Sequence, residues 1–444
     1  MTSPPHEGEV TDGEWGAGWK IVAAGACGVG TTWTLFQITA GLFVIPMQAD
    51  FGWSRTSLAI GPVGGLICAL FFPLAGALID RYGPRRMAII GTILFSIGLL
   101  MFAVAPPRPL IFYSILLYTS IVGSVASAVV FAKGVTTWFT RRLGTALGFT
   151  MTGASITSAI AIPLLSSLIA HHGWRTGFLG LAGIVLFIGL PVILLWFRVR
   201  SDVHKRPDLA PGMDGISVGQ AVKDKRFWLL IISFGVAGVA IGGFLTHLQP
   251  ILVGLGISRS SAATFGSIFV ISIGIGRMII GSLLDRAYPP LVAGGSLFFS
   301  GLGALQLALL NVNEIRMFAV GIAVSMVGLA QGAESDYQAF FTMRIFGERS
   351  FSRLFGIIAS VMASSMAVGG ILFAALFDHY GDYHLAMWGS VATFFLAALL
   401  LSMVNVPSLP DIEGNRMQRI SEKHVPIGVH DEHIKAVKIL DLGA

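Results

Sequence analysis

The stretch FPLAGALIDRYGP (Phe72–Pro84) decides the fold, because a related stretch, RMIIGSLLDRAYP (Arg277–Pro289), returns later in the chain. Each copy contains the pattern G-x-x-x-D-R, which places a small residue one turn before a charged helix end and lets a neighbouring helix approach closely. The matched positions share one offset of 205 residues: Gly76 with Gly281, Asp80 with Asp285, and Arg81 with Arg286. This recurrence predicts two related halves.

Both copies close an apolar run, and the chain has twelve such runs, each near the roughly 20 residues that a membrane-spanning helix needs. We therefore predict an all-α integral membrane protein with twelve transmembrane helices in two six-helix, pseudo-symmetric bundles. The runs lie at about 20–48, 57–80, 87–105, 110–138, 143–170, 174–197, 227–253, 260–284, 291–311, 316–342, 354–378 and 384–404. The predicted segments are an N-tail (1–19), a first bundle (20–197), a linker (198–226), a second bundle (227–404) and a C-tail (405–444).

The composition is that of a membrane protein rather than of a soluble enzyme. Hydrophobic residues make up 54% of the 444 residues and charged residues only 12%, whereas soluble domains carry about 25% charged residues. The two cysteines, Cys27 and Cys68, cannot build a disulfide framework or a metal cluster. Because no P-loop or Ser–His–Asp spacing stands out, we expect neither an enzyme nor a cofactor. The N-tail lacks the basic start of a signal peptide, so we expect the first helix to be retained.

The basic residues set the orientation of the predicted spans. With both termini in the cytoplasm, the cytoplasmic segments hold 22 of the 29 Lys and Arg residues and the opposite face holds five. This distribution follows the preference for positive charge on the inner side. Only Lys133 and Arg277 remain within spans. The net charge of +6 is therefore explained by topology, and we expect no nucleic-acid partner.

The loop between the second and third runs carries a family motif. Its residues, GALIDRYGPRR (Gly76–Arg86), resemble the signature of the major facilitator superfamily, and the second half keeps only the glycine, aspartate and arginine of it. The resemblance extends over essentially all twelve runs. It implies a secondary transporter that works by alternating access, with two bundles rocking around a central site.

Shorter motifs resemble the monocarboxylate transporter branch of that superfamily and its bacterial oxalate/formate-antiporter relatives. They are EWGAGW (Glu14–Trp19), FGWSR (Phe51–Arg55), WFTRRLGTALGFTMTG (Trp138–Gly153), GWR (Gly173–Arg175) and GAESD (Gly332–Asp336). The branch implies symport of a small monocarboxylate-like anion with H⁺ as the coupling ion, in the inner membrane of a bacterium. The expected partners are that anion and the lipid bilayer, and we expect a monomer.

The chain also departs from the branch. Animal lactate carriers have a lysine where this chain has Ile38 and an aspartate where it has Ile273, and oxalate carriers have a helix 11 lysine that Leu354–Asp378 lacks. A larger, more apolar carboxylate therefore fits at least as well as lactate or oxalate. A carrier of a vitamin, peptide, aromatic acid or drug, for uptake or efflux, stays open as an alternative, as does a membrane sensor without turnover.

Arg277 is the sharpest candidate for substrate binding. It lies eight residues, or roughly 12 Å along a helix, before Asp285, and a charge at that depth normally faces a cavity or a partner. Its guanidinium can grip a carboxylate with two N–H groups. It also matches the helix 8 arginine that binds substrate carboxylate in the branch. The competing interpretation is a structural ion pair with Glu334 or Asp336.

Glu334, Asp336 and His247 are the candidates for proton coupling. The two carboxylates lie about 200° apart around a helix, which predicts that at least one of them reaches the bundle interior. A poorly hydrated carboxylate binds its proton more tightly, and a fixed salt bridge is an equal alternative. Imidazole titrates near pH 6.5, although a neutral interfacial histidine is the slightly favoured interpretation of His247.

The remaining candidates are cavity and gate residues. Ordinary packing is the commoner role for any one of the cavity candidates, which are Tyr118, Tyr337, Gln37 and Trp33. Basic gate residues are expected to pair with carboxylates of a neighbouring helix when the inner side is closed. The gate candidates are Asp80, Arg81, Arg85, Arg86, Asp285 and Arg286. Lys133 is expected to snorkel to the cytoplasmic interface or to pair with a carboxylate of the tenth helix.

Overall fold

Helices account for nearly all of the computed structural model, which describes residues 9–54, 57–58, 60–199, 215–310, 317–332 and 334–406. Within these residues, twelve helical stretches are long and apolar enough to cross a membrane, and no strand occurs. The predicted fold class is therefore confirmed. Arg55 of the FGWSR motif, most of the linker and nearly all of the C-tail lie outside the described residues.

The first six spans run from α1 to α10. Prolines begin α5 and α6, where a helix needs no N–H, and Gly83, with a φ of +86°, allows the tight turn before α5. The elements are α1 (Glu9–Thr31), α2 (Trp33–Thr39), α3 (Gly41–Phe51), α4 (Ile60–Tyr82), α5 (Pro84–Ala103), α6 (Pro109–Val125), α7 (Ala128–Thr136), α8 (Leu143–His172), α9 (Trp174–Gly183), a π-helical turn (Ile184–Gly189) and α10 (Leu190–Trp196).

The last six spans run from α12 to α18. Side chains of Asp224 and Ser258 cap the starts of α12 and α13 by accepting backbone N–H groups. The elements are the short α11 (Val218–Ala221), α12 (Lys225–Gly254), α13 (Arg259–Leu284), α14 (Pro289–Ala308), α15 (Met317–Gly332), α16 (Glu334–Phe346), α17 (Phe351–Tyr380) and α18 (His384–Ser402).

Within the described residues, the helices of spans 1 and 4 are interrupted partway along their length. Span 1 breaks at Thr32, between α1 and α2, and span 4 breaks between α6 and α7. The two breaks meet, because the Trp33 N–H donates to the Ala126 carbonyl over 3.4 Å. Span 10 comprises α15 and α16, which lie on either side of residue 333, outside the described residues. Breaks such as those in spans 1 and 4 are tolerated in lipid only where neighbouring groups or water satisfy the freed backbone.

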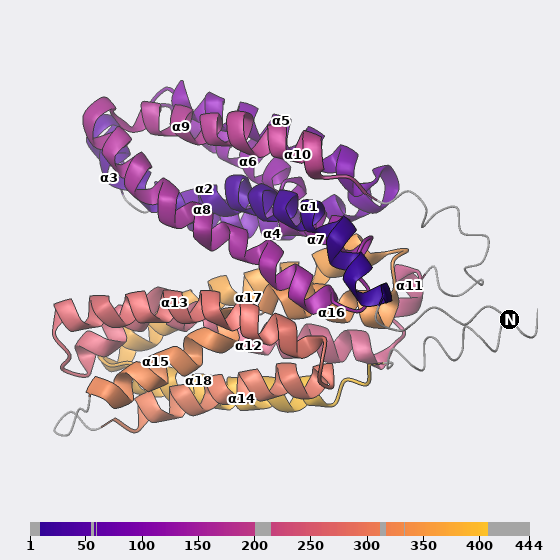
Figure 1. The fold of residues 1–444 in the computed structure, drawn as a ribbon. Coiled ribbons are helices and arrows are strands. Elements are labelled where there is room, and N and C mark those ends of the chain that lie inside the picture. The colour runs from indigo at the N-terminus through magenta and orange to yellow at the C-terminus, as the bar shows by residue number, and fades with distance from the viewer. Residues whose placement is uncertain are drawn as a thin grey trace, which may run out of the picture.

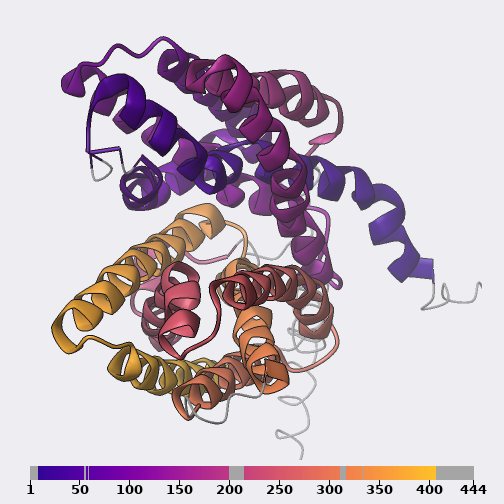
Figure 2. The ribbon, with the colours of Figure 1, turned by 90° about the vertical axis from the view of Figure 1, so that its left-hand side faces the viewer.

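Figure 1 shows two helical bundles, α1–α10 in indigo to magenta and α12–α18 in red to yellow. They meet at the end where α16 and the start of α1 lie and spread apart toward the other end, from which Figure 2 is viewed. Across the boundary α4 packs along α17 and α8 packs along α13. Glycines permit this approach, because a Cβ at Gly76 would overlap the Ser352 carbonyl and one at Gly144 the Gly281 carbonyl. We call the two ends the closed end and the spread end.

Candidate functional site

Arg277 lies on α13 at the boundary between the bundles. Its Nε donates to the Gly332 carbonyl over 2.7 Å, at the end of α15, and its Nη1 donates to the Met151 carbonyl of α8 over 2.7 Å. The first contact is within the second bundle and the second reaches the first bundle. The guanidinium therefore ties the end of α15 to the opposite bundle.

Glu334 and Asp336 lie in the first turn of α16. The Asp336 side chain is completely buried, and Glu334 has one buried carboxylate oxygen. Among the described residues, that oxygen and both oxygens of Asp336 have no hydrogen-bond partner. Arg277 lies within electrostatic range of both carboxylates, although no ion pair joins it to either of them in the described chain. The three residues thus form a charge cluster, which we call the central cluster.

The four cavity candidates do not gather at the central cluster. Trp33 is buried inside the first bundle, where its ring packs against Phe36 and Phe95. The Tyr118 hydroxyl donates to the Leu94 carbonyl of α5 over 3.1 Å.

Tyr337 follows Asp336 directly in α16, but its hydroxyl binds a different helix, and Gln37 belongs to α2 of the first bundle. Tyr337 is completely buried, and its hydroxyl shares a short hydrogen bond with the Ser296 hydroxyl of α14. Gln37 is exposed, and its side-chain amide rests on Gly65 of α4. Each of the four is therefore placed by contacts within its own bundle.

His247 lies near the spread end of α12, away from the central cluster. Its Nδ1 is 3.1 Å from the Tyr383 hydroxyl and its Nε2 is 3.0 Å from the Gly370 carbonyl. The carbonyl can only accept, so the assigned tautomer carries its proton on Nε2 and accepts from Tyr383. Both ring nitrogens of a neutral imidazole are thereby satisfied.

Two aspartates hold the bundles together at the closed end, because each caps the start of a helix in the opposite bundle. At the end of α4, the Asp80 carboxylate accepts the backbone N–H groups of Ser352 (3.1 Å) and Arg353 (3.0 Å) at the start of α17. At the end of α13, Asp285 accepts the N–H of Gly144 (2.7 Å) and both the N–H (2.8 Å) and the hydroxyl (2.7 Å) of Thr145 at the start of α8. A carboxylate at a helix N-terminus is favourable both as a hydrogen-bond acceptor and in the helix dipole. The repeated motif thus gives one reciprocal cap in each direction.

Burial raises the pKa of the Asp285 carboxyl, and the hydrogen bonds from Thr145 and Gly144 partly oppose that rise. The cap consequently weakens at a higher pH than an ordinary aspartate would suggest, because protonation removes the charge that accepts these bonds.

The arginine gate candidates are arranged differently from the prediction. Arg85 donates to the Leu194 carbonyl within its own bundle over 3.1 Å, and Arg81 stacks on Tyr82. Within the described residues, Arg81, Arg85, Arg86 and Arg286 form no ion pair with a carboxylate. The carboxylates at the closed end bind backbone N–H groups instead, because two helices begin there with unpaired donors.

Three further residues of the closed end were not predicted as gate residues. Lys133, buried in α7, places its Nζ 2.6 Å from the Glu348 carbonyl and 3.6 Å from its carboxylate, across the bundle boundary. Glu14 accepts the N–H groups of residues 140–142 over 3.2–3.3 Å. Arg344 donates to the Thr140 carbonyl over 2.9 Å. The in-span charge of Lys133 is a sequence signal, but nothing in the sequence pairs it with a residue 215 positions away.

The chain matches the family profile of the Major Facilitator Superfamily over residues 23–337. It is 26% identical to monocarboxylate transporter 11 of Mus musculus over 412 residues, which cover 90% of this chain and 89% of that protein. It is 27% identical over 369 residues to an uncharacterised 38 kDa protein in the 23S RNA operon of Thermoproteus tenax, covering 82% of this chain and 88% of that protein.

Solved structures with a similar fold include two transporters, each 14% identical to this chain. FucP in its outward conformation matches with a TM-score of 0.67 over 86% of this chain and 98% of that one. The proton:xylose symporter XylE bound to 6-bromo-6-deoxy-D-glucose matches with a TM-score of 0.67 over 90% of this chain and 99% of that one. At this identity the likeness shows the fold alone.

Proposed function

Because the chain belongs to the Major Facilitator Superfamily, we propose that it is a secondary active transporter that carries a monocarboxylate-like organic anion together with a proton. Its similarity to monocarboxylate transporter 11 over nearly its whole length supports this substrate class. The chain works as a multi-pass protein of a bacterial inner membrane, with both termini and the closed end on the cytoplasmic side.

The central cluster is the observation that carries the proposal. Arg277 is the one charged donor there, and its guanidinium has N–H groups beyond the two that bind Gly332 and Met151. These groups hold the substrate carboxylate. Glu334 and Asp336 lie within electrostatic range of Arg277, so that they compete with an incoming anion for the same positive charge.

This competition couples the anion to the proton. With both carboxylates ionised, the three residues carry one net negative charge, which repels an anion. Protonation of Glu334 or Asp336 removes that repulsion, and by linkage a bound anion raises the proton affinity of the carboxylates to the same extent. Anion and proton therefore load together.

Alternating access requires contacts between the bundles that form in one state and break in the other, and the closed end supplies them. Substrate enters from the spread end, and the bundles then rock so that the caps of Asp80 and Asp285 and the Lys133–Glu348 contact break. Each of these contacts joins the two bundles, and each can be lost without unfolding either of them.

Proteoliposomes test the proposal. The purified full chain is reconstituted with a pH-sensitive dye, and external lactate, butyrate or benzoate is added to the wild type, Arg277→Gln and the matched control Arg108→Gln. Arg108 is an exposed arginine before α6. We expect external alkalinisation with at least one acid in the wild type and the control, and at least a tenfold loss in Arg277→Gln. Alkalinisation that Arg277→Gln leaves unchanged would refute the role of Arg277.

The carboxylate variants separate binding from coupling. Glu334→Gln or Asp336→Asn should exchange the labelled anion down its own gradient while no longer accumulating it against that gradient in response to an imposed pH difference. If both variants accumulate the anion as the wild type does, the proton moves elsewhere. A carrier of a neutral substrate would show uptake that does not depend on Arg277.

A further inference from the structure

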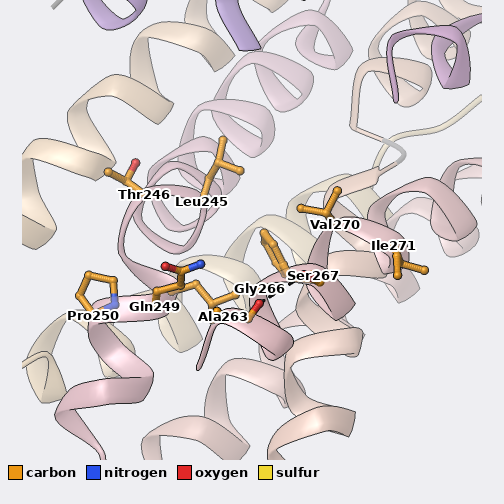
Figure 3. A pocket seen from close by; sticks show the side chains of 11 residues that line it. Leu245, Thr246, Gln249, Pro250, Ala263, Gly266, Ser267, Val270 and Ile271 are labelled. Carbon is orange, nitrogen blue, oxygen red and sulfur yellow. Dashed lines mark hydrogen bonds between the residues drawn. The ribbon is translucent and has the colours of Figure 1, made fainter. Parts of the chain in front are cut away.

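A pocket of about 660 Å³ lies between α12 and α13 toward the spread end, and Figure 3 shows its lining. None of the residues that line it is charged. Its wall is largely apolar, with Leu245, Phe269 and Val270 among the side chains, and its polar side chains are Thr246, Gln249 and Ser267.

The pocket shares one face of α13 with Arg277. Residues 270, 274, 277 and 281 repeat every three to four positions and so lie along one stripe of the helix. At the closed end this stripe meets α8, because Arg277 donates to Met151 and Gly281 packs on Gly144. The same stripe continues along α13 toward the spread end, where the two bundles separate (Figure 2).

The surface of α13 between Arg277 and the pocket is uncovered at Gly274. Val270 lies seven residues before Arg277, or roughly 10 Å along the helix. Gly274 stands between them, and a Cβ added there would meet no atom within 4 Å. A chain-like molecule held at Arg277 can therefore run along Gly274 into the pocket.

The polar groups of the pocket are uncharged and available. The Gln249 amide rests on Gly266, where a Cβ would lie 2.9 Å from Nε2, and it makes no hydrogen bond within the described residues. Thr246 donates its hydroxyl to the Gly242 carbonyl over 2.8 Å, which leaves the oxygen free to accept. The pocket thus offers apolar contact together with a neutral donor and acceptor.

We propose that this pocket is a second recognition point for the substrate and receives the apolar end of an acid whose carboxylate binds Arg277. The substrate class that follows is an elongated, amphiphilic monocarboxylate that reaches roughly 10 Å from its carboxylate, with space for one uncharged hydrogen-bonding group. Lactate-sized acids reach Arg277 alone. The inference rests on the proposed function, since it requires the carboxylate to bind Arg277.

A chain-length series measures the contribution of the pocket. Dissociation constants of acetate, butyrate, hexanoate and octanoate are determined calorimetrically for the purified full chain. Gly274→Leu obstructs the route, and the matched control is Gly389→Leu on α18, where an added Cβ also meets no atom within 4 Å. In the wild type and the control, we expect the affinity to rise by about fourfold for each methylene that reaches past Gly274. In Gly274→Leu, we expect acetate affinity within twofold of the wild type and no rise with length.

The outcomes separate the two proposals. If no acid binds, or if Arg277→Gln leaves binding unchanged, the proposed function fails and this inference fails with it. If binding depends on Arg277 but is equal at all lengths, or if Gly274→Leu and Gly389→Leu give the same series, the pocket is refuted while the transport proposal stands. Ser267→Phe, which fills the pocket from an exposed position, repeats the test should Gly274→Leu not fold.

Discussion

Replacing Asp285 by alanine should open the closed end without unfolding either bundle. The carboxylate accepts three hydrogen bonds from the start of α8, two from Thr145 and one from Gly144, at 2.7–2.8 Å. One hydrogen bond to a charged group contributes about 1.5–3 kcal/mol. When the bundles separate, water replaces some of these three hydrogen bonds. We therefore assign to the whole cap the value of a single bond, about 2 kcal/mol. This free energy corresponds to a roughly 30-fold shift of the equilibrium toward the opened state.

The shift is measurable as a distance distribution. Spin labels are attached at the exposed positions Arg86 and Arg349, one in each bundle at the closed end, after Cys27 and Cys68 have been replaced by serine. Double electron–electron resonance then gives the populations of the short and the long distance. Arg286→Ala, at the exposed neighbour of Asp285, is the matched control and should leave the populations unchanged.

Acidification should imitate the Asp285→Ala substitution in the wild type. Because burial raises the pKa of Asp285, protonation removes the cap as the pH falls, and the long-distance population should grow before an exposed aspartate would titrate. A distribution in Asp285→Ala equal to that of the control would refute the cap as a closing element. A shift in the opposite direction would refute it as well.

Three further substitutions test other contacts. Gly76→Val should shift the same distances toward the opened state, because its side chain would overlap the Ser352 carbonyl; an unchanged distribution would contradict the close approach of α4 and α17. Lys133→Met should open the closed end by roughly tenfold, since it leaves Glu348 without its charged partner; labelling of a cysteine introduced on the boundary would report it. Asp224→Asn should lower the thermal stability at neutral pH, and the difference from the wild type should shrink in acid, because Arg226 lowers the Asp224 pKa and the stabilisation is lost as the pH falls through that lowered value.

Much of the fold was predictable from patterns that repeat. Apolar runs longer than 18 residues have few other solutions in a chain with 12% charge, and the described part of the chain contains twelve helical stretches that could span a membrane. The glycine and aspartate of the repeated motif were predicted to sit at a close helix contact, and Gly76 and Asp80 both face α17. These contacts were predictable because the G-x-x-x-D-R motif occurs in both halves and each copy ends a helix in the same way.

The partners of these residues were not predictable, because most of them are backbone groups. Arg277 binds two carbonyls, and Asp80 and Asp285 bind N–H groups. Nearly every residue has these backbone groups, so the residue type does not show which of them is the partner. The break at Thr32 lies inside an unbroken apolar run and contains no proline. Glu348 was missed because it follows span 10 in a polar turn, where a carboxylate is ordinary.

The reciprocal caps give the boundary the character of an isologous dimer interface. In such an interface the same patch occurs on both partners, and each makes to the other the contact that it receives. Asp80 caps the helix that opens span 11, and Asp285 caps the helix that opens span 5, its counterpart in the other half. The chain therefore behaves as a symmetric dimer whose two subunits have been fused. One consequence for the proposed alternating access is mechanical: each half holds one of the two caps, so the closed end opens only when the contacts made by both halves have broken.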